Sequence, residues 1–164
     1  DVDFDVSIVV DAVDGQGYKK LATFVGSVLC APQEVNNKPP PTDVADLGEY
    51  TLLCYSQTPD LWQRIFAAFG QPMPQQPRLK LYNDAQLLLE AAAHGLGVAV
   101  GTAPFASPML KSGALIDPFN HQFSTGDGIV LKYGRGGELN PAAVTFADWA
   151  SKLIPAVYRG MTEG

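Results

Sequence analysis

The sequence predicts an α/β domain with a mainly parallel sheet. Short apolar runs that do not alternate with polar residues recur along the chain, as in strands buried on both faces, and the longer segments between them have helical spacing. With 46% hydrophobic and 17% charged residues, the composition is typical of a globular chain that buries a core. A length of 164 residues fits one domain or two small lobes.

One stretch, YNDAQLLLEAAAHGLGVAVGT, combines these features. Asn83 is the expected N-cap of a helix that ends at Gly95, and residues 98–100 are the expected strand after it. Gly101 and Thr102 then lie at the carboxyl end of that strand, where open α/β sheets bind ligands. The glycines here close a helix and open a strand, whereas a phosphate-binding turn follows a strand and opens a helix. A dinucleotide site is therefore not predicted.

The other elements follow the same patterns in chain order. Strands are expected over residues 4–10, 21–30, 51–54, 79–82, 115–116 and 129–133. Helices are expected to begin at Pro59, Pro104 and Pro141, because proline fits the first helical turn and apolar residues follow each at helical spacing. The proline-rich segment 31–48 is expected to be a surface connection between strands.

Charge and hydropathy exclude several classes of partner. The net charge is −6, with 11 basic and 17 acidic residues, and binding a phosphate backbone requires a positive face, so no direct contact with nucleic acid is expected. No apolar run approaches the roughly 20 residues that span a bilayer, so no membrane contact is expected. Asp1 stands where an initiator Met belongs, and we expect the chain to be part of a longer protein.

The chemistry-bearing residues do not form a catalytic or metal-binding pattern. Cys30 and Cys54 lie in apolar runs, which predicts two buried thiols, with a single disulfide as the alternative. Free thiols indicate a reducing compartment, the cytoplasm. His94 follows a predicted helix and His121 lies in a predicted loop, without a Ser or Cys nucleophile in a suitable turn. We expect no enzyme activity, no metal and no cofactor.

Six stretches, in a fixed order, carry a family resemblance: DVDFDVSI, VLCAP, LWQRIFAAFGQP, YNDAQLLLEAAAHGLGVAVG, LKSGALIDPF and FADWASKL. In this order and spacing the chain resembles the effector-binding region of LysR-type transcriptional regulators over nearly its whole length. The resemblance implies a periplasmic-binding-protein-like fold of type 2, in which two lobes are joined by two crossover strands and the effector lies between them.

The resemblance also implies how the chain is divided. Residues 1–30 would be part of the first lobe with the first crossover strand, and residues 31–123 a complete second lobe. Residues 124–164 would be the return crossover and the C-terminal helix of the first lobe. The rest of the first lobe and a helix-turn-helix domain would lie upstream of Asp1, and the unpaired edge of the strand at 4–10 would promote dimerisation.

The function implied is small-molecule sensing that controls DNA binding through the absent helix-turn-helix domain, in a homo-oligomer. A solute-binding protein, or a binding-protein-like enzyme lobe of the same fold, is the alternative. A third reading, a purely structural oligomerisation lobe, predicts that no ligand changes the melting temperature.

The candidates for effector contact are Ser7, Asp11, Asn83, Asp84, Gly101, Thr102 and Ile129. For Asn83 and Asp84, plain helix capping is an equally good interpretation and is compatible with binding. The charge of Asp84 competes with an anionic ligand for the helix amides, so a carboxylate ligand needs Arg or Lys from elsewhere, or a different pose. Ser7 and Asp11 lie on the strand that the resemblance places at the cleft, with burial as the alternative for Ser7. Ile129 is either an apolar wall or part of the core.

Overall fold

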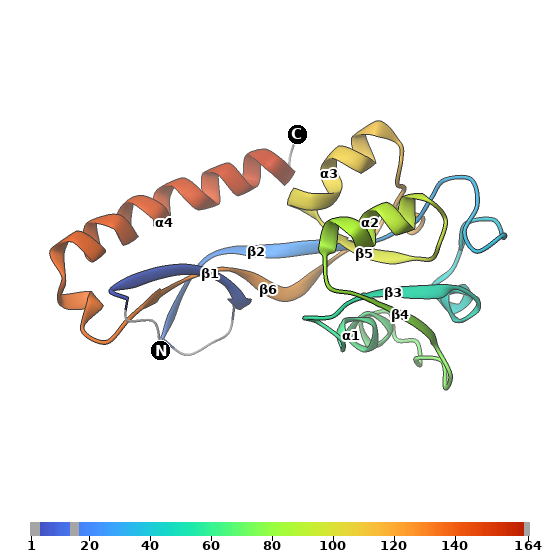
Figure 1. The fold of residues 1–164 in the computed structure, drawn as a ribbon, viewed down its shortest axis with the longest axis horizontal. Coiled ribbons are helices and arrows are strands. Elements are labelled where there is room, and N and C mark those ends of the chain that lie inside the picture. The colour runs from blue at the N-terminus through green and yellow to red at the C-terminus, as the bar shows by residue number, and fades with distance from the viewer. Residues whose placement is uncertain (1–3, 14–16, 163–164) are drawn as a thin grey trace. The chain divides into compact units, whose positions relative to one another are not determined.

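The computed structural model describes residues 4–13 and 17–162, so Asp1 and the first residues of the DVDFDVSI stretch lie outside the described part. The chain divides into two compact units. Unit 1 combines the described residues up to Val25 with those from Ser124 on, and unit 2 comprises residues 26–123. Figure 1 shows the elements of both units in chain order.

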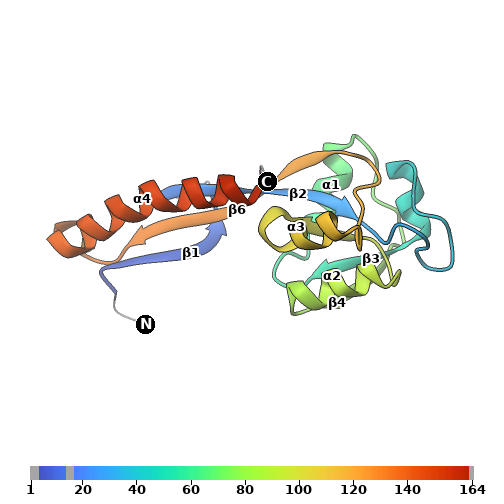
Figure 2. The same ribbon diagram turned by 90° about the horizontal axis from the view of Figure 1, so that it is seen from above.

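Unit 1 is a sheet with a long helix on one face. β1 (Val6–Ala12) pairs antiparallel with β6 (Gln122–Tyr133), and β6 lies next to β2 (Tyr18–Leu29). After the short η2 (Gly137–Leu139), α4 (Pro141–Thr162) runs along these strands in both ribbon views (Figures 1 and 2).

The inner face of α4 forms the core of unit 1. Residues spaced three or four apart on α4 pack against the sheet, as expected for an amphipathic helix: Ala147, Ala150, Ile154 and Tyr158. Ala147 and Ala150 pack with Leu21 and Leu131 of the sheet. The Tyr158 ring stacks on Phe24 of β2 at 5.9 Å between centroids, and its hydroxyl accepts the Val25 amide at 3.3 Å.

Unit 2 contains a parallel strand pair. β3 (Thr51–Tyr55) pairs in parallel with β4 (Arg78–Tyr82), and Leu52 of β3 forms a parallel bridge with Val98. β5 (Ala99–Thr102) continues from Val98 and pairs antiparallel with the second half of β2. The helices are η1 (Val44–Glu49), α1 (Leu61–Ala68), α2 (Ala85–Ala93) and α3 (Ala103–Ser112).

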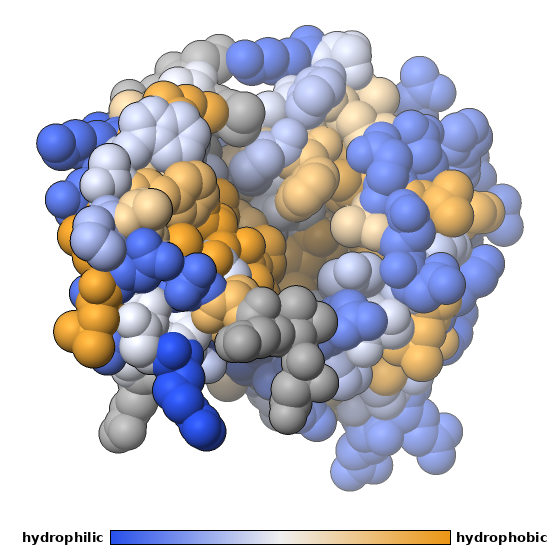
Figure 3. All heavy atoms as spheres, turned by 60° about the vertical axis from the view of Figure 1, so that its left-hand side comes forward, coloured by the Kyte–Doolittle hydropathy of each residue, from blue (hydrophilic) through white to orange (hydrophobic). Residues whose placement is uncertain are grey.

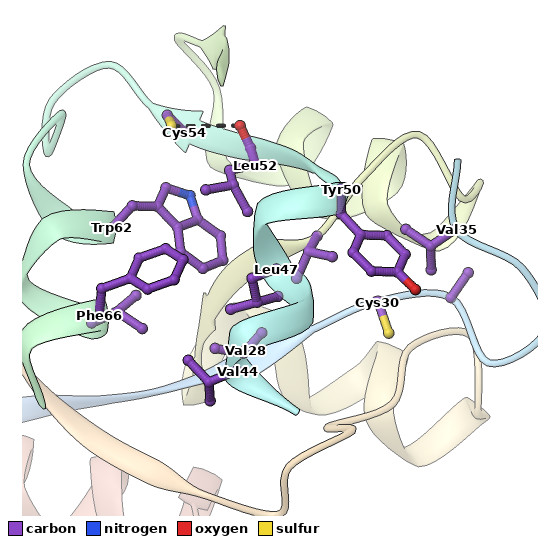
Figure 4. Packing of buried hydrophobic residues seen from close by; sticks show 13 residues of the cluster. Val28, Cys30, Val35, Val44, Leu47, Tyr50, Leu52, Cys54, Trp62 and Phe66 are labelled. Carbon is purple, nitrogen blue, oxygen red and sulfur yellow. Dashed lines mark hydrogen bonds between the residues drawn. The ribbon is translucent and has the colours of Figure 1, made fainter. Parts of the chain in front are cut away.

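β3 separates two apolar clusters because its successive side chains point to opposite faces. Leu52 and Cys54 belong to the cluster that contains Trp62 and Phe66 of α1, drawn in Figure 4. Leu53 belongs to the second cluster, with Leu88, Leu89 and Ala92 of α2 among its members. The indole Nε1 of Trp62 donates to the Leu53 carbonyl at 3.0 Å, so this large buried side chain leaves no polar atom unpaired.

The expectation of a mainly parallel sheet is wrong. β1 with β6 and β2 with β5 are antiparallel, and the described parallel contacts are the β3–β4 pair and the Leu52–Val98 bridge. The physical reason is that an unbroken apolar run reports burial on both faces. A strand of either direction that lies between two cores has such a run.

Two expected strands also differ. The strand expected at 129–133 in fact begins at Gln122. Its first half was not predicted because it contains Gly126 and Gly128, which are unusual inside strands. A Cβ at Gly128 would lie 2.0 Å from the Ala22 carbonyl oxygen of the neighbouring strand, so close backbone approach requires glycine there. The strand expected at 115–116 is a single bridge between Ile116 and Cys30. Among the described helices, none has the length and apolar character to cross a membrane.

Candidate functional site

The carboxyl ends of three strands meet at one edge of unit 2. β3 and β4 are parallel, and the bridge from β3 to Val98 gives β5 the same direction, so Tyr55, Tyr82 and Thr102 end their strands on the same side. The next helix in each case, α1, α2 or α3, begins after that end. Helix N-termini carry unpaired amides and a partial positive charge, so this carboxyl edge of unit 2 is suited to a polar ligand.

At the start of α2 the cap is Asp84 and not Asn83, which corrects the expected position by one residue. The Asp84 backbone is extended, with φ −130° and ψ 125°, and its Oδ1 accepts the Leu87 amide at 2.9 Å. Asn83 stands just before the cap and is exposed, as Asp84 is. A carboxylate at the N-cap stabilises the helix through its charge as well as its hydrogen bond. Both residues are within reach of a ligand at the carboxyl edge.

Gly101 and Thr102 have different positions at the end of β5. Gly101 is buried, and a Cβ there would lie 2.4 Å from Leu29 Cδ1 and 2.9 Å from the Ala106 Cβ, so this glycine allows β5 to pack closely against α3. Thr102 is the half-buried N-cap residue of α3, but its side chain makes no capping hydrogen bond. The Thr102 hydroxyl is therefore available to a ligand.

Charges of both signs lie near the carboxyl edge. Lys80 of β4 pairs in register with Leu53, on the face that packs toward α2, and its Nζ lies 5.7 Å from the centroid of the Tyr82 ring. Asp84 supplies a carboxylate at the start of α2. An ammonium and a carboxylate near one set of helix amides match a ligand that itself carries both charges.

Among the candidates of unit 1, Asp11 forms an ion pair with Lys132. Asp11 Oδ2 lies 2.5 Å from the Nζ of Lys132 on the neighbouring β6, and this ammonium also lies 4.0 Å from the centroid of the Tyr18 ring. The hydrogen bond from Lys132 lowers the pKa of Asp11, and the same bond raises the pKa of Lys132. Ser7 pairs in register with Lys132 and is half-buried.

Ile129 is not brought together with Ser7 and Asp11. It pairs in register with Val10, so it lies on the opposite face of the sheet from Ser7 and Asp11. There it packs against the cluster that includes Ala147 of α4. Its position is that of a core residue in unit 1.

Two basic residues near the candidate positions, Lys80 and Lys132, are not among those predicted from the sequence. Each follows an apolar residue inside a strand. A lysine at such a position usually points to solvent from the exposed face of the sheet, so neither was considered for the site. The contact between Asp11 and Lys132 was not readable from either strand alone, because it depends on how the strands pair: the register places Lys132 opposite Ser7 and Asp11 opposite Gly128.

A hollow in unit 2 lies at the C-terminal end of α2, away from the carboxyl edge. It has a volume of about 590 Å³. Asn36, His94, Gly95 and Leu96 are among the residues that line it. Because carbonyl groups end a helix, this hollow presents acceptors where the carboxyl edge presents donors. It is a competing location for a ligand.

The expected free thiols are confirmed. Cys30 and Cys54 are unbridged and buried, and burial raises the pKa of the Cys30 thiol to about 11. Such thiols are unreactive in the folded state. Among the described residues, no group of three or more His, Cys, Asp or Glu side chains is placed to hold a metal ion.

Residues 2–154 match the family model described as the LysR substrate binding domain. The chain belongs to this family. LysR substrate-binding domains have the type 2 periplasmic-binding-protein-like fold, so the expected fold class is confirmed. The effector domain of the transcriptional regulator AmpR of Pseudomonas aeruginosa has a TM-score of 0.72 to this chain at 28% identity. The similarity covers 95% of this chain and 75% of that domain.

Curated relatives of this LysR-family chain are transcriptional activators. The HTH-type activator AmpR of Pseudomonas aeruginosa is 32% identical over 147 residues, which are 88% of this chain and 48% of the activator. The glycine cleavage system activator of Escherichia coli is 27% identical over 120 residues, 72% of this chain and 39% of that protein. The chain thus spans less than half the length of these relatives, and they favour the regulator over the solute-binding reading.

Proposed function

We propose that the chain senses a small-molecule effector for a LysR-type transcriptional regulator and that the effector contacts the carboxyl edge of unit 2. The observation that carries the proposal is the meeting of three strand ends with the starts of α1, α2 and α3 at this edge. Ligands of open α/β folds collect at such edges. Thr102, Asn83 and Asp84 are the contact residues we propose, and Gly101 allows close packing behind them.

The chemistry of the edge favours an amphoteric effector, with an ammonium and a carboxylate in one small molecule. Asp84 suits the ammonium, whereas the helix amides and Lys80 suit the carboxylate. A ligand with only negative charge meets the Asp84 carboxylate at the same amides and binds less well.

In the whole protein, effector binding would shift an equilibrium between two conformations by the difference in its affinity for them. A helix-turn-helix domain in a longer protein would then carry the change to DNA, within a cytoplasmic homo-oligomer. The chain itself would have no catalytic function and no cofactor. The family of the chain, and the names of relatives that are transcriptional activators, support these proposals.

The effector chemistry is testable by thermal denaturation with the twenty common amino acids as probes, against acetate and methylammonium as singly charged controls. At about 100-fold above its Kd, a ligand stabilises the fold by roughly 2.7 kcal/mol, which corresponds to a rise in Tm of several degrees. We expect amino acids to raise Tm in the wild type and less in Asp84→Asn, which retains a capping oxygen but not the charge. An equal rise with acetate, or no difference in Asp84→Asn, would contradict the amphoteric assignment.

A further inference from the structure

The hollow at the C-terminal end of α2 combines a preformed shape with polar groups that have no partner in the described part of the chain. Its volume of about 590 Å³ lies within the range of small-molecule sites. Apolar atoms are also open among hydrophilic ones elsewhere on the surface (Figure 3). Exposed apolar side chains are normal on folded proteins, so the hollow is the more specific feature.

One wall of the hollow is a tight turn held by hydrogen bonds. The Val35 amide donates to the Lys38 carbonyl at 2.8 Å, and the Lys38 amide donates to the Val35 carbonyl at 3.0 Å. Asn36 and Asn37, which lie between them and line the hollow, both have positive φ, of 53° and 60°, as in a type I′ turn. The side chain of Asn36 also ties this turn to the segment that follows α2. The wall is therefore preorganised, and little ordering opposes the binding of a ligand.

The end of α2 supplies hydrogen-bond acceptors to the hollow. The amides of Gly95 and Leu96 donate to carbonyls in the last turn of α2, at 2.9 Å and 3.0 Å, and so close the helix. No described residue donates a hydrogen bond to the carbonyls of Ala93 and His94. These carbonyls lie at the negative end of the helix dipole, so they favour a cation that carries N–H donors.

Two side chains that line the hollow add further acceptors. The Nδ1 of His94 lies 2.8 Å from the Glu90 carbonyl oxygen, and because a carbonyl only accepts, this nitrogen carries the proton. The Nε2 of the neutral ring is then an acceptor. Glu34 is exposed and forms no ion pair with a described residue, and no Lys or Arg is among the described residues that line the hollow. The electrostatic preference is for positive charge.

The rest of the lining is partly apolar and suits an alkyl chain. Leu96 is exposed by 48%, and three alanines also line the hollow: Ala31, Ala93 and Ala114. Covering them removes apolar surface from water. We infer that the hollow binds a primary alkylammonium ion, with the ammonium at Glu34, His94 and the free carbonyls and the alkyl chain against Leu96. This is a second site, at the opposite end of α2 from the carboxyl edge, and it does not depend on the proposed effector site.

The test is an amide NMR titration of the full 164-residue chain with pentylammonium chloride at about 0.15 M salt, which screens long-range attraction to the acidic chain. We expect saturable shift changes at Asn37, His94 and Leu96, with a Kd in the millimolar range for so small a ligand. Pentyltrimethylammonium has the same charge and chain but no N–H donor, and 1-pentanol has no charge. Each should bind at least about tenfold more weakly. Equal affinity for either control, or no saturable change at the hollow up to about 100 mM, would overturn the inference.

Glu34→Gln removes the charge but retains a side-chain oxygen, so we expect the affinity for pentylammonium to fall about tenfold. The matched control is Glu138→Gln, which removes the same charge from an exposed position in unit 1 and leaves the Kd unchanged. Thr102→Val, at the carboxyl edge, should also leave it unchanged, which separates this site from the effector site. The amide spectrum shows whether each variant is folded. An equal loss in both glutamate variants, or a loss in Thr102→Val, would overturn the assignment to the hollow.

Discussion

At the residue scale, Asn36 joins three segments of unit 2. It has a left-handed backbone with φ 53°, which asparagine tolerates better than most residues. Its Nδ2 donates to the Leu96 carbonyl at 3.0 Å, its Oδ1 accepts the Thr51 amide at 2.7 Å, and its own amide donates to the Gly95 carbonyl at 2.8 Å. One side chain thereby ties the end of α2 to the start of β3.

Asn36→Ala should lower the free energy of unfolding by about 2–3 kcal/mol, because it removes both side-chain bonds and leaves the Thr51 amide and the Leu96 carbonyl without their partner. Asn37→Ala is the matched control, since Asn37 has a similar φ of 60° and is exposed. Its cost should be only the backbone strain of about 1 kcal/mol. Urea denaturation measures both. Equal losses for the two variants would show that the hydrogen bonds of Asn36 contribute nothing.

The Asp11–Lys132 pair makes the stability of unit 1 depend on pH. The hydrogen bond from Lys132, assisted by the Ala12 amide, lowers the pKa of Asp11 below its ordinary value of 3.8. The unfolded chain therefore binds the proton more readily than the folded one. It follows that the contribution of Asp11 is complete above about pH 4 and is lost as pH falls through the folded pKa.

Asp11→Asn should lower the urea midpoint between about pH 5 and 8, and the difference from the wild type should shrink as the pH falls below about 4. In a Lys132→Met background the same substitution should have a smaller effect, because the partner that lowers the Asp11 pKa is gone. A wild-type to Asp11→Asn difference that is the same at pH 3 and pH 7 would mean that the pair does not stabilise the fold.

At the scale of elements, the turn from α2 into β5 depends on a glycine. Gly95 follows the C-cap of α2 with φ 72°, and a Cβ there would lie 2.5 Å from the Glu34 carbonyl oxygen. Gly113 ends α3 with a similar φ of 76°, but apart from its chain neighbours no described atom lies within 4 Å of a Cβ placed there. The two positions share the strain of a left-handed residue and differ in the contact with neighbouring backbone.

Gly95→Ala should therefore destabilise the chain by about 3 kcal/mol or more, since backbone strain and the clash add, whereas Gly113→Ala should cost about 1 kcal/mol. Thermal or urea denaturation of the two variants gives the comparison. If Gly113→Ala costs as much as Gly95→Ala, the close approach of residue 34 to the end of α2 does not determine this turn.

The sequence predicts the elements of unit 2 better than their pairing. The helix α2, its end at Gly95 and the strand after it are readable because caps and apolar spacing act within a few residues. The pairing and direction of the strands are not readable, since they depend on partners far along the chain. For example, β2 pairs with β5 some 70 positions later. The predicted N-cap of α2 is wrong by one residue for a local reason: Asn83 and Asp84 are both residue types that suit an N-cap.

At the scale of the whole molecule, part of the candidate site could be predicted and part could not. Thr102 at the end of β5 and Asp84 at the start of α2 are identifiable, because ligand sites of α/β folds lie where strands end and the next helices begin. The faces of β1 and β6 were not identifiable, so Ile129 was grouped with Ser7 although it lies on the opposite face. The pairing register decides which face a side chain lies on, and a shift of one residue moves every side chain of the strand to the other face.

The measurement that tests the central claim most directly is an amide NMR titration of the isotope-labelled chain with the amino acids that raise Tm, or with the whole set in mixtures if none does. We predict that the largest shift changes occur at Asn83, Asp84 and Thr102, the proposed contact residues at the carboxyl edge. They should be lost in Thr102→Val, which replaces only the hydroxyl with a methyl group, and retained in Thr42→Val, which makes the same change just before η1 (Val44–Glu49). Shift changes confined to the hollow around Asn36 and His94, or no changes at the carboxyl edge with any probe, would contradict the claim that the effector binds at the carboxyl edge of unit 2.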